Sequence, residues 1–173
     1  MPELLKLLLD RIDTPIGELL LATDAAGRLR ALDWSDYEER MLRLLRLHYG
    51  KGGFQIVPAH NPHGLRDTMN RYFAGDNAAI NDVAVATAGT PFQRAVWSEL
   101  RKIPSGSTIS YGNLAKRIAR PKAVRAVGLA NGSNPIGIVV PCHRVIGADG
   151  SLTGYGGGIE RKRWLLEHER GSG

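Results

Sequence analysis

Hydrophobic and polar positions at the start of the chain form three short extended runs separated by turn residues. The runs cover residues 4–9, 18–23 and 28–34, and the turns between them lie at 14–17 (Thr-Pro-Ile-Gly) and 25–27 (Ala-Ala-Gly). Proline and glycine favour chain reversal at such positions. Consecutive extended runs joined by tight turns predict a three-stranded antiparallel meander.

Helical spacing replaces this pattern after Ser35. Ser35 is suited to cap a helix, with Glu38 at its third position, and Gly50 is suited to end it. One face of the predicted helix carries Tyr37, Met41, Leu44, Leu45 and His48. This spacing predicts an amphipathic helix that packs on the sheet.

The pattern weakens beyond that helix. Residues 54–57 predict a further strand, and the turn at 61–64 (Asn-Pro-His-Gly) predicts the start of a second helix that ends near Ala74. Residues 75–88 carry few structural signals, so we interpret them as a linker. His60 and His63 are spaced like metal ligands, but a proline separates them and no cysteine or carboxylate cluster completes a site, which favours turn residues over zinc.

A sharper pattern opens the second half of the chain. Thr90, followed by Pro91 and Gln93, is typical of a helix start, because Thr and Gln at this spacing satisfy each other's backbone amides. The apolar stripe of this helix consists of Phe92, Val96, Leu100 and Ile103. Since Pro104 stops the pattern, we predict a helix over residues 90–103.

Two shorter helices are expected to follow. Ser110 is suited to cap the first, which runs to Ile118, and Pro121 opens the second, which ends at 131–132 (Asn-Gly). Two short helices joined by a tight turn indicate a helix-turn-helix.

The second of these helices has no bulky polar side chain between Arg125 and Asn131 that can read base edges. Small residues occupy four of its positions: Ala123, Ala126, Gly128 and Ala130. A thin helix can approach a groove wall closely, which suits DNA binding without sequence readout. Small residues also let two helices pack closely, and both interpretations can hold on opposite faces.

The charge distribution adds to this picture. The composition is that of a globular protein, with 43% hydrophobic and 23% charged residues. The net charge of +6 at pH 7 is uneven, because residues 1–85 carry −2 and residues 86–173 carry +8. Cations confined to one half favour a surface that binds a polyanion, with nucleic acid preferred over a device for solubility.

Cys142 is the only cysteine of the chain, and His143 follows it directly. A lone cysteine forms no intramolecular disulfide, and the sequence shows neither an export leader nor a run of about 18 apolar residues. We therefore expect a cytoplasmic protein with a free thiol and no membrane partner. A free thiol is mostly protonated at pH 7, so nucleophilic chemistry requires a neighbour such as His143. The competing interpretation is a small buried hydrophobe.

Seven segments of the second half occur in a specific order: Pro91-Phe92-Gln93, Tyr111-Gly112, Arg125-Ala126-Val127-Gly128, Asn134-Pro135, Pro141-Cys142-His143-Arg144-Val145, Gly154-Tyr155-Gly156-Gly157-Gly158 and Trp164-Leu165-Leu166. Together they resemble the methylated-DNA–protein-cysteine methyltransferases, which repair O6-alkylguanine in DNA. The similarity extends with compatible spacing from about Thr90 to Glu169 and includes the turn at 14–17. In size and in its first half the chain is most similar to the constitutive bacterial form.

The resemblance implies that Cys142 attacks the alkyl carbon and keeps the alkyl group, so that each molecule acts once, with no cofactor and no metal. His143 is expected to take part through a water molecule. Glu169 is expected to orient the imidazole and stabilise its charged form, with Glu167 and His168 as rivals for that position.

Two further catalytic residues are implied. Tyr111 is expected to stand by the phosphate at the lesion, help turn the nucleotide and supply a proton or hydrogen bond to the leaving guanine. Asn134 is held extended or in a turn by Pro135, and its amide is expected to brace the segment that carries Cys142.

For DNA the resemblance implies base flipping, because an O6-alkyl carbon inside a duplex is beyond the reach of a protein side chain. Arg125 is expected to fill the gap, although from the residues alone a phosphate contact is equally open. The other expected DNA contacts are Ala123, Ala126, Gly128 and Tyr111. The base pocket is expected at Tyr155, Gly156 and Val145, where relatives often carry a larger residue at the Gly156 position.

We expect two domains. Residues 1–86 form an α/β domain with a short antiparallel sheet of ribonuclease-H-like type, and residues 87–170 form a mainly α domain with a winged helix-turn-helix. The expected partner is double-stranded DNA carrying O6-alkylguanine, with O4-alkylthymine as a second substrate, bound by a monomer without regard to sequence. Two other classes stay open: a cysteine hydrolase, which would turn over, and a winged-helix DNA-binding protein with an incidental cysteine.

Overall fold

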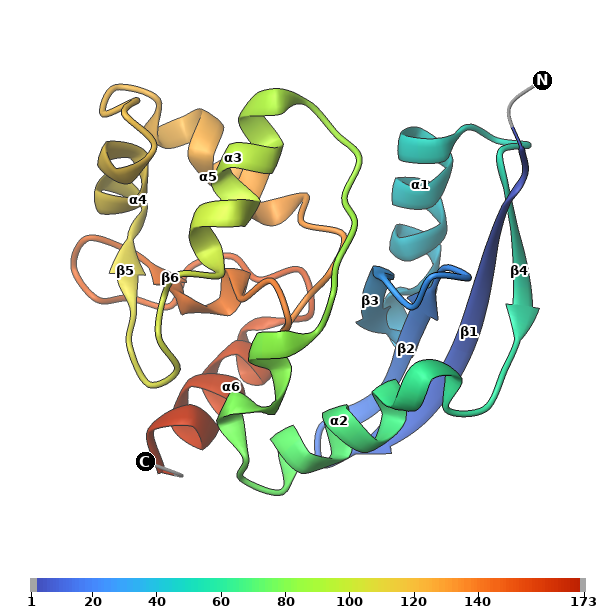
Figure 1. The fold of residues 1–173 in the computed structure, drawn as a ribbon. Helices are drawn as coiled ribbons and strands as arrows, with labels where there is room; N and C mark the ends of the chain where they lie inside the picture. The colour runs from blue at the N-terminus through green and yellow to red at the C-terminus, as the bar shows by residue number, and fades with distance from the viewer. Residues whose placement is uncertain (1–2, 172–173) are drawn as a thin grey trace. The chain divides into compact units, whose positions relative to one another are not determined.

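The computed structural model describes residues 3–171. The chain divides into two compact units, Met1–Ala88 and Gly89–Gly173, which are coloured from blue to green and from green to red in Figure 1. Each unit is described by itself below. No described helix is long and apolar enough to cross a lipid bilayer.

The first unit is built on a four-stranded sheet. β1 (Leu5–Thr14) pairs antiparallel with β2 (Gly17–Thr23), and β2 pairs antiparallel with β3 (Leu29–Trp34), so the predicted meander is confirmed. β4 (Phe54–Pro58) pairs in parallel with the other edge of β1. The expectation of a purely antiparallel sheet is therefore wrong, because the helix between β3 and β4 carries the chain back to the end at which β1 starts.

Two helices accompany this sheet. α1 (Glu38–Tyr49) buries Met41, Leu44 and Leu45, as its spacing predicts. Ser35 does not cap it, because residues Ser35–Tyr37 form a separate 3-10 turn before the helix begins. α2 (Leu65–Phe73) follows the predicted turn. The buried core between sheet and helix consists of Leu7, Leu20, Ala22, Ala31, Met41 and Leu45.

The stretch after α2 has more structure than a linker. A 3-10 helix over Asn77–Asp82 buries Ile80. Beyond it Val85 forms a parallel bridge with Leu29. The backbone amide of Leu29 donates to the carbonyl of Ala84 at 2.8 Å, and the carbonyl of Leu29 accepts from the amide of Ala86 at 3.0 Å. The linker interpretation of residues 75–88 is wrong, since part of this stretch extends the sheet edge at β3.

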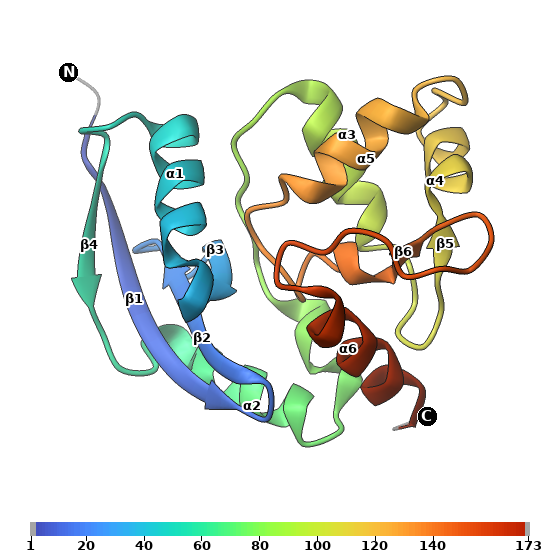
Figure 2. The ribbon, with the colours of Figure 1, turned by 180° about the vertical axis from the view of Figure 1, so that it is seen from behind.

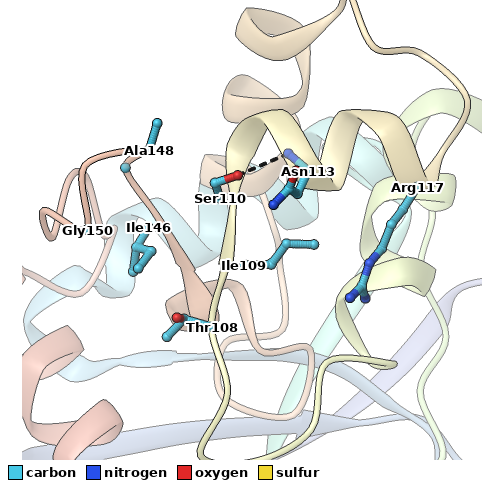
Figure 3. Close-up of a pocket in the computed structure, with 9 residues that line it drawn as sticks. Thr108, Ile109, Ser110, Asn113, Arg117, Ile146, Ala148 and Gly150 are labelled. Atoms are coloured by element: carbon cyan, nitrogen blue, oxygen red, sulfur yellow. Dashed lines mark hydrogen bonds between the residues drawn. The ribbon is translucent and has the colours of Figure 1, made fainter.

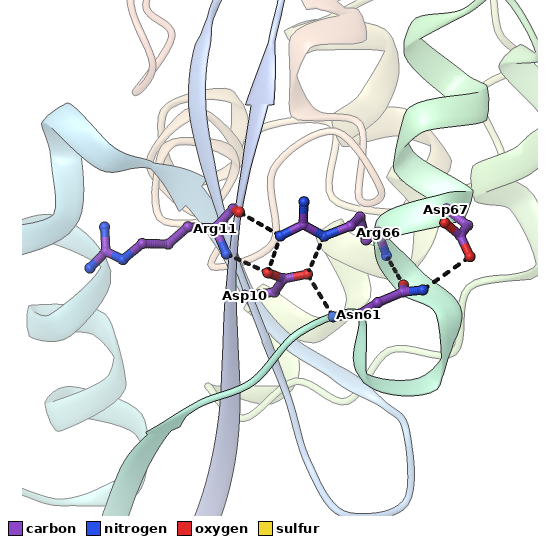
Figure 4. Close-up of polar contacts among 5 residues, drawn as sticks. All are labelled: Asp10, Arg11, Asn61, Arg66 and Asp67. Atoms are coloured by element: carbon purple, nitrogen blue, oxygen red, sulfur yellow. Dashed lines mark hydrogen bonds and ion pairs between the residues drawn. The ribbon is translucent and has the colours of Figure 1, made fainter.

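A partly buried ion pair joins α2 to β1 (Figure 4). Arg66 donates to both carboxylate oxygens of Asp10, at 3.0 and 2.6 Å, and the backbone amide of Asn61 donates to the same carboxylate at 3.0 Å. Burial alone would raise the pKa of Asp10, but these donors lower it.

His60 and His63 are both exposed. Within residues 3–171 no group of three His, Cys, Asp or Glu residues is arranged to hold a metal.

Over residues 89–171, which the structure describes, the second unit contains four α-helices and a two-stranded parallel sheet. The helices are α3 (Pro91–Leu100), α4 (Tyr111–Arg117), α5 (Val124–Gly132) and α6 (Ile159–Gly171), and the strands are β5 (Ile109–Ser110) and β6 (Val145–Ile146). α3 and α5 lie side by side in Figures 1 and 2, and the indole of Trp97 donates to the carbonyl of Ala130 at 2.8 Å.

Two predicted helix caps are confirmed in this unit. Thr90 and Gln93 form a capping box with bonds of 3.0 and 3.1 Å, and the Ser110 hydroxyl accepts from the backbone amide of Asn113 at 3.1 Å. α3 ends earlier than predicted, because residues 101–103 tighten into a turn whose amides bond three residues back. α5 begins at Val124 rather than Pro121, since residues 121–123 form a turn.

Candidate active site

Cys142 is the first residue of a 3-10 turn over Cys142–Arg144, which leads into β6. Because the backbone turns here, the alternation of side chains along a strand does not separate Cys142 from His143. Cys142 is 9% exposed. Four residues upstream, Ile138 has a φ of 63°, a left-handed conformation that is costly for a β-branched residue. The backbone that leads to the thiol is therefore strained.

Two asparagines hold this strained segment. The side-chain amide of Asn134 donates to the backbone carbonyl of Val140 at 2.7 Å and to that of Ile136 at 3.2 Å. The side-chain oxygen of Asn134 accepts from the backbone amide of Ile136 at 3.0 Å. Asn131, buried at the end of α5, donates to the carbonyl of Cys142 at 3.4 Å. The structure thus brings Asn134 to the nucleophile segment. Sequence reasoning missed Asn131, since an asparagine at a helix end is usually a terminator.

Glu169 is the carboxylate that faces His143. The imidazole Nε2 lies 2.9 Å from Glu169 Oε2, and both side chains are fully buried. Of the two rivals on α6, Glu167 is exposed and His168 stacks on Trp164 with ring centroids 4.7 Å apart. One face of the helix thus brings Glu169 to the imidazole.

Arg144 binds the same carboxylate and had no role in the sequence analysis. Its guanidinium donates to Glu169 Oε1 at 2.8 Å and to Oε2 at 2.9 Å, and its third nitrogen donates to the carbonyl of Ile103 at 2.6 Å. Arg144 is 3% exposed. A buried carboxylate with a bidentate arginine is already paired, so Glu169 stabilises a charged imidazole less than a carboxylate without that arginine would.

The protonation states follow from these contacts. Burial lowers the pKa of His143, and the charges of Arg144 and Lys162 act in the same direction against the pull of Glu169. Burial alone would raise the pKa of Glu169, but His143 and Arg144 hold it far below its usual range. A neutral imidazole beside an ionised carboxylate carries its proton on Nε2. Nδ1 is buried and has no hydrogen-bond partner among residues 3–171, so its lone pair is available as a base.

Lys162 is a second residue that sequence reasoning missed. It is 0% exposed on α6, and its ammonium donates to the carbonyls of Val145 at 2.6 Å and Thr153 at 2.8 Å. Burial lowers its pKa to about 8, and the charge of Cys142 acts in the opposite direction. The hydroxyl of Tyr111 reaches the same Thr153 carbonyl at 3.5 Å. Lys162 therefore places a positive charge near the thiol and joins β6 to the loop before α6.

The spacing of residues along α6 contains a signal from which the burial of Lys162 and Glu169 could have been predicted. On α6 the buried positions are Lys162, Leu165, Leu166 and Glu169. They follow the spacing of an apolar stripe, so the two charged residues stand where a core-facing side chain is expected.

The remaining predicted site residues lie on two parts of the unit. Val145 is buried in β6, Tyr155 is partly buried and Gly156 is exposed in the loop before α6. On α5 and its first turn, Arg125 and Ala126 are exposed, and Ala123 and Gly128 are partly buried. A Cβ added to Gly128 would lie 3.9 Å from the ring of Tyr111, which is an ordinary van der Waals contact, so α5 passes beside that ring with space for a small side chain.

A cavity of about 480 Å³ lies beside this site (Figure 3). Its lining comes from residues 108–110 at β5, from Asn113 and Arg117 of α4, from Ile146 and from the turn at 147–150, with the Ser110 to Asn113 hydrogen bond on its wall. None of the predicted site residues lines it. We therefore regard it as a neighbouring hollow and not as the pocket of the thiol.

Comparison with known proteins gives consistent matches. Residues 91–171 match the family model described as the DNA-binding domain of 6-O-methylguanine DNA methyltransferase. A methylated-DNA–protein-cysteine methyltransferase of Shigella flexneri is 55% identical over 166 residues, which cover 96% of this chain and 97% of that protein. One of Mycobacterium tuberculosis is 50% identical over 163 residues, covering 92% and 90%.

Solved structures agree. The crystal structure of Mycobacterium tuberculosis O6-methylguanine methyltransferase matches with a TM-score of 0.79 and 44% identity, covering 96% of this chain and 94% of that one. The crystal structure of Mycobacterium tuberculosis OGT in complex with DNA matches with a TM-score of 0.78 and 44% identity, covering 95% and 94%. The match covers both units of the chain.

Proposed function

Because the chain belongs to the methylated-DNA–protein-cysteine methyltransferases, we propose that it repairs O6-alkylguanine in DNA by moving the alkyl group onto Cys142. One observation carries this proposal: the only cysteine of the chain begins a turn that follows a strained segment, next to a buried histidine with an available nitrogen. The sulfur forms a bond to the alkyl carbon, and the bond from that carbon to O6 breaks. The electron pair stays with guanine, which takes up a proton.

The proton path follows from the site. His143 Nδ1 accepts the proton of the thiol through a water molecule, and Glu169 and Arg144 hold the ring in the required tautomer. Lys162 stabilises the resulting thiolate by its charge. The hydroxyl of Tyr111 supplies the proton or hydrogen bond that guanine needs as it leaves, and a tyrosinate formed in this way regains its proton from the charged imidazole through solvent. The product is a thioether with no route back to the thiol, so each molecule reacts once.

Duplex DNA is the proposed partner, bound without sequence preference by a monomer. No acidic residue lies between Glu99 and Asp149, while this stretch carries many cations. Such a surface suits the phosphate backbone. Arg125 enters the duplex from α5 and fills the gap of the extruded base, with Ala123, Ala126, Gly128 and Tyr111 close to the groove wall. We also propose that the first unit is of ribonuclease-H-like type and that the helix-turn-helix of the second unit is winged.

The extruded base is received by Val145, Tyr155 and Gly156. Glycine at position 156 leaves space for alkyl groups larger than methyl, and O4-alkylthymine is proposed as a second substrate. The proposed location is the cytoplasm, where a free thiol stays reduced.

A titration with labelled substrate tests this function. Duplex DNA with a labelled methyl group on O6 of one guanine is added in increasing excess to the protein, and the label transferred to protein is counted. We expect a plateau at one methyl per molecule, and no transfer to Cys142→Ala. A hydrolase would release label into solution with repeated turnover, and a binding protein with an incidental cysteine would transfer none.

A further inference from the structure

α5 carries a large apolar side chain on its exposed surface. Leu129 is 71% exposed, and it follows Arg125 by four residues. Residues four apart lie on the same face of a helix, one turn from each other. Gly132, one further turn along, is exposed as well. The face that presents Arg125 is therefore thin at most positions but not at Leu129.

Exposure by itself says little about Leu129. Single exposed apolar side chains are common on protein surfaces, and Leu47 on α1 is 73% exposed. The two leucines differ in their surroundings. Leu47 is preceded by Arg46 and followed by His48 in a unit with a net negative charge, whereas Leu129 lies in a stretch that holds cations and no acidic residue.

The surroundings of Leu129 identify the occupant of this surface. Arg120, Lys122 and Arg125 are exposed at the start of α5 or just before it, and Val124 is 40% exposed beside them. A face that combines cations with apolar side chains is complementary to duplex DNA, whose phosphates are anionic and whose minor groove is walled by apolar sugar carbons. Proteins that open base steps from the minor groove insert side chains such as Leu there.

We propose that Leu129 is a DNA-contacting residue that packs against the groove wall next to the gap filled by Arg125. This inference rests on the proposed function and deepens it. Arg125 supplies charge and occupies the gap, and Leu129 removes apolar surface from water at the adjacent step. An apolar contact of this kind holds the opened duplex without reading its sequence, and it depends little on salt.

Rates of methyl transfer under single-turnover conditions test this role. The variants are Leu129→Ala, Leu129→Met, which keeps an apolar side chain of similar length, and Leu47→Ala as the control of matched exposure. Each is measured with a duplex containing one O6-methylguanine, at several salt concentrations and at protein concentrations below saturation. Each is also measured with free O6-methylguanine base, which needs no DNA contact.

We expect Leu129→Ala to react roughly tenfold more slowly with the duplex, with an unchanged salt dependence and an unchanged rate on the free base. Leu129→Met should retain most of the duplex rate, and Leu47→Ala all of it. The inference is overturned if Leu129→Ala repairs the duplex at the wild-type rate, or if it loses the same factor on the free base. If wild-type protein accepts no methyl group from either substrate, the proposed function itself has failed.

Discussion

Replacing Lys162 with methionine removes a charge from the interior of the second unit and keeps most of the side-chain length. Burial lowers the pKa of Lys162 from 10.5 to about 8. A difference of one pKa unit between the folded and the unfolded chain corresponds to about 1.4 kcal/mol. The buried ammonium therefore lowers the free energy of unfolding by about 3 kcal/mol when Lys162 is charged in both states.

The sign of the pH dependence follows from the direction of this shift. Below pH 8 Lys162 is protonated in the folded and the unfolded chain, and the folded protein bears the whole cost. Between pH 8 and 10.5 the folded protein gives up the proton while the unfolded chain keeps it, so the free energy of unfolding rises with pH. Above 10.5 both states are neutral at this residue and the cost is gone.

Urea unfolding of wild type and Lys162→Met, from pH 7 to 10.5, measures this contribution. We expect wild type to gain about 3 kcal/mol relative to Lys162→Met across the upper part of that range. Lys116→Met, which removes an exposed lysine of α4, should follow the wild-type curve. Parallel curves for wild type and Lys162→Met would refute the reasoning, because Lys162 would then titrate like a surface lysine. Cys142 should also react more slowly with iodoacetamide at pH 7 in Lys162→Met, because its thiolate loses a positive neighbour.

Three further predictions concern the site. Arg125→Ala should repair duplex DNA roughly 100-fold more slowly while reacting normally with free O6-methylguanine base, because only the duplex requires an extruded base; equal losses on both substrates would contradict the gap-filling role. Glu169→Gln should lower the free energy of unfolding by about 3–5 kcal/mol in urea titrations, since it leaves Arg144 buried without a counter-ion. Glu167→Gln, exposed on the same helix, should change it by less than about 0.5 kcal/mol. Methylation of Cys142 should destabilise the protein by about 1–3 kcal/mol, because it adds carbon to a packed site; calorimetry before and after reaction checks this, and equal melting temperatures would count against it.

Local rules predicted the parts of the fold that local chemistry determines. The meander follows from its turns, and the caps at Thr90 and Ser110 follow from side chains that satisfy nearby amides. Long-range pairing was not readable. β4 joins β1 in parallel, and Val85 pairs with Leu29, because of how the chain returns to the sheet, which no local spacing encodes.

The candidate site shows the same division. The resemblance pointed to Cys142 and Glu169, and the structure places Glu169 against the imidazole of His143. The roles of Arg144 and Lys162 depend on the burial of their side chains. Charged side chains are rarely buried, so from the sequence both are expected to be exposed to solvent. Their contacts change the account of the site. The carboxylate of Glu169 has two partners, His143 and Arg144, and a buried lysine of α6 interacts electrostatically with Cys142.

The most direct test of the central claim is peptide mass spectrometry of the protein after one exposure to excess duplex DNA containing O6-methylguanine. The account predicts a single methyl group on the peptide that contains Cys142, one per protein molecule, with the DNA restored in the same amount. Repair beyond one guanine per protein molecule, or an unmodified Cys142 after repair, would contradict it.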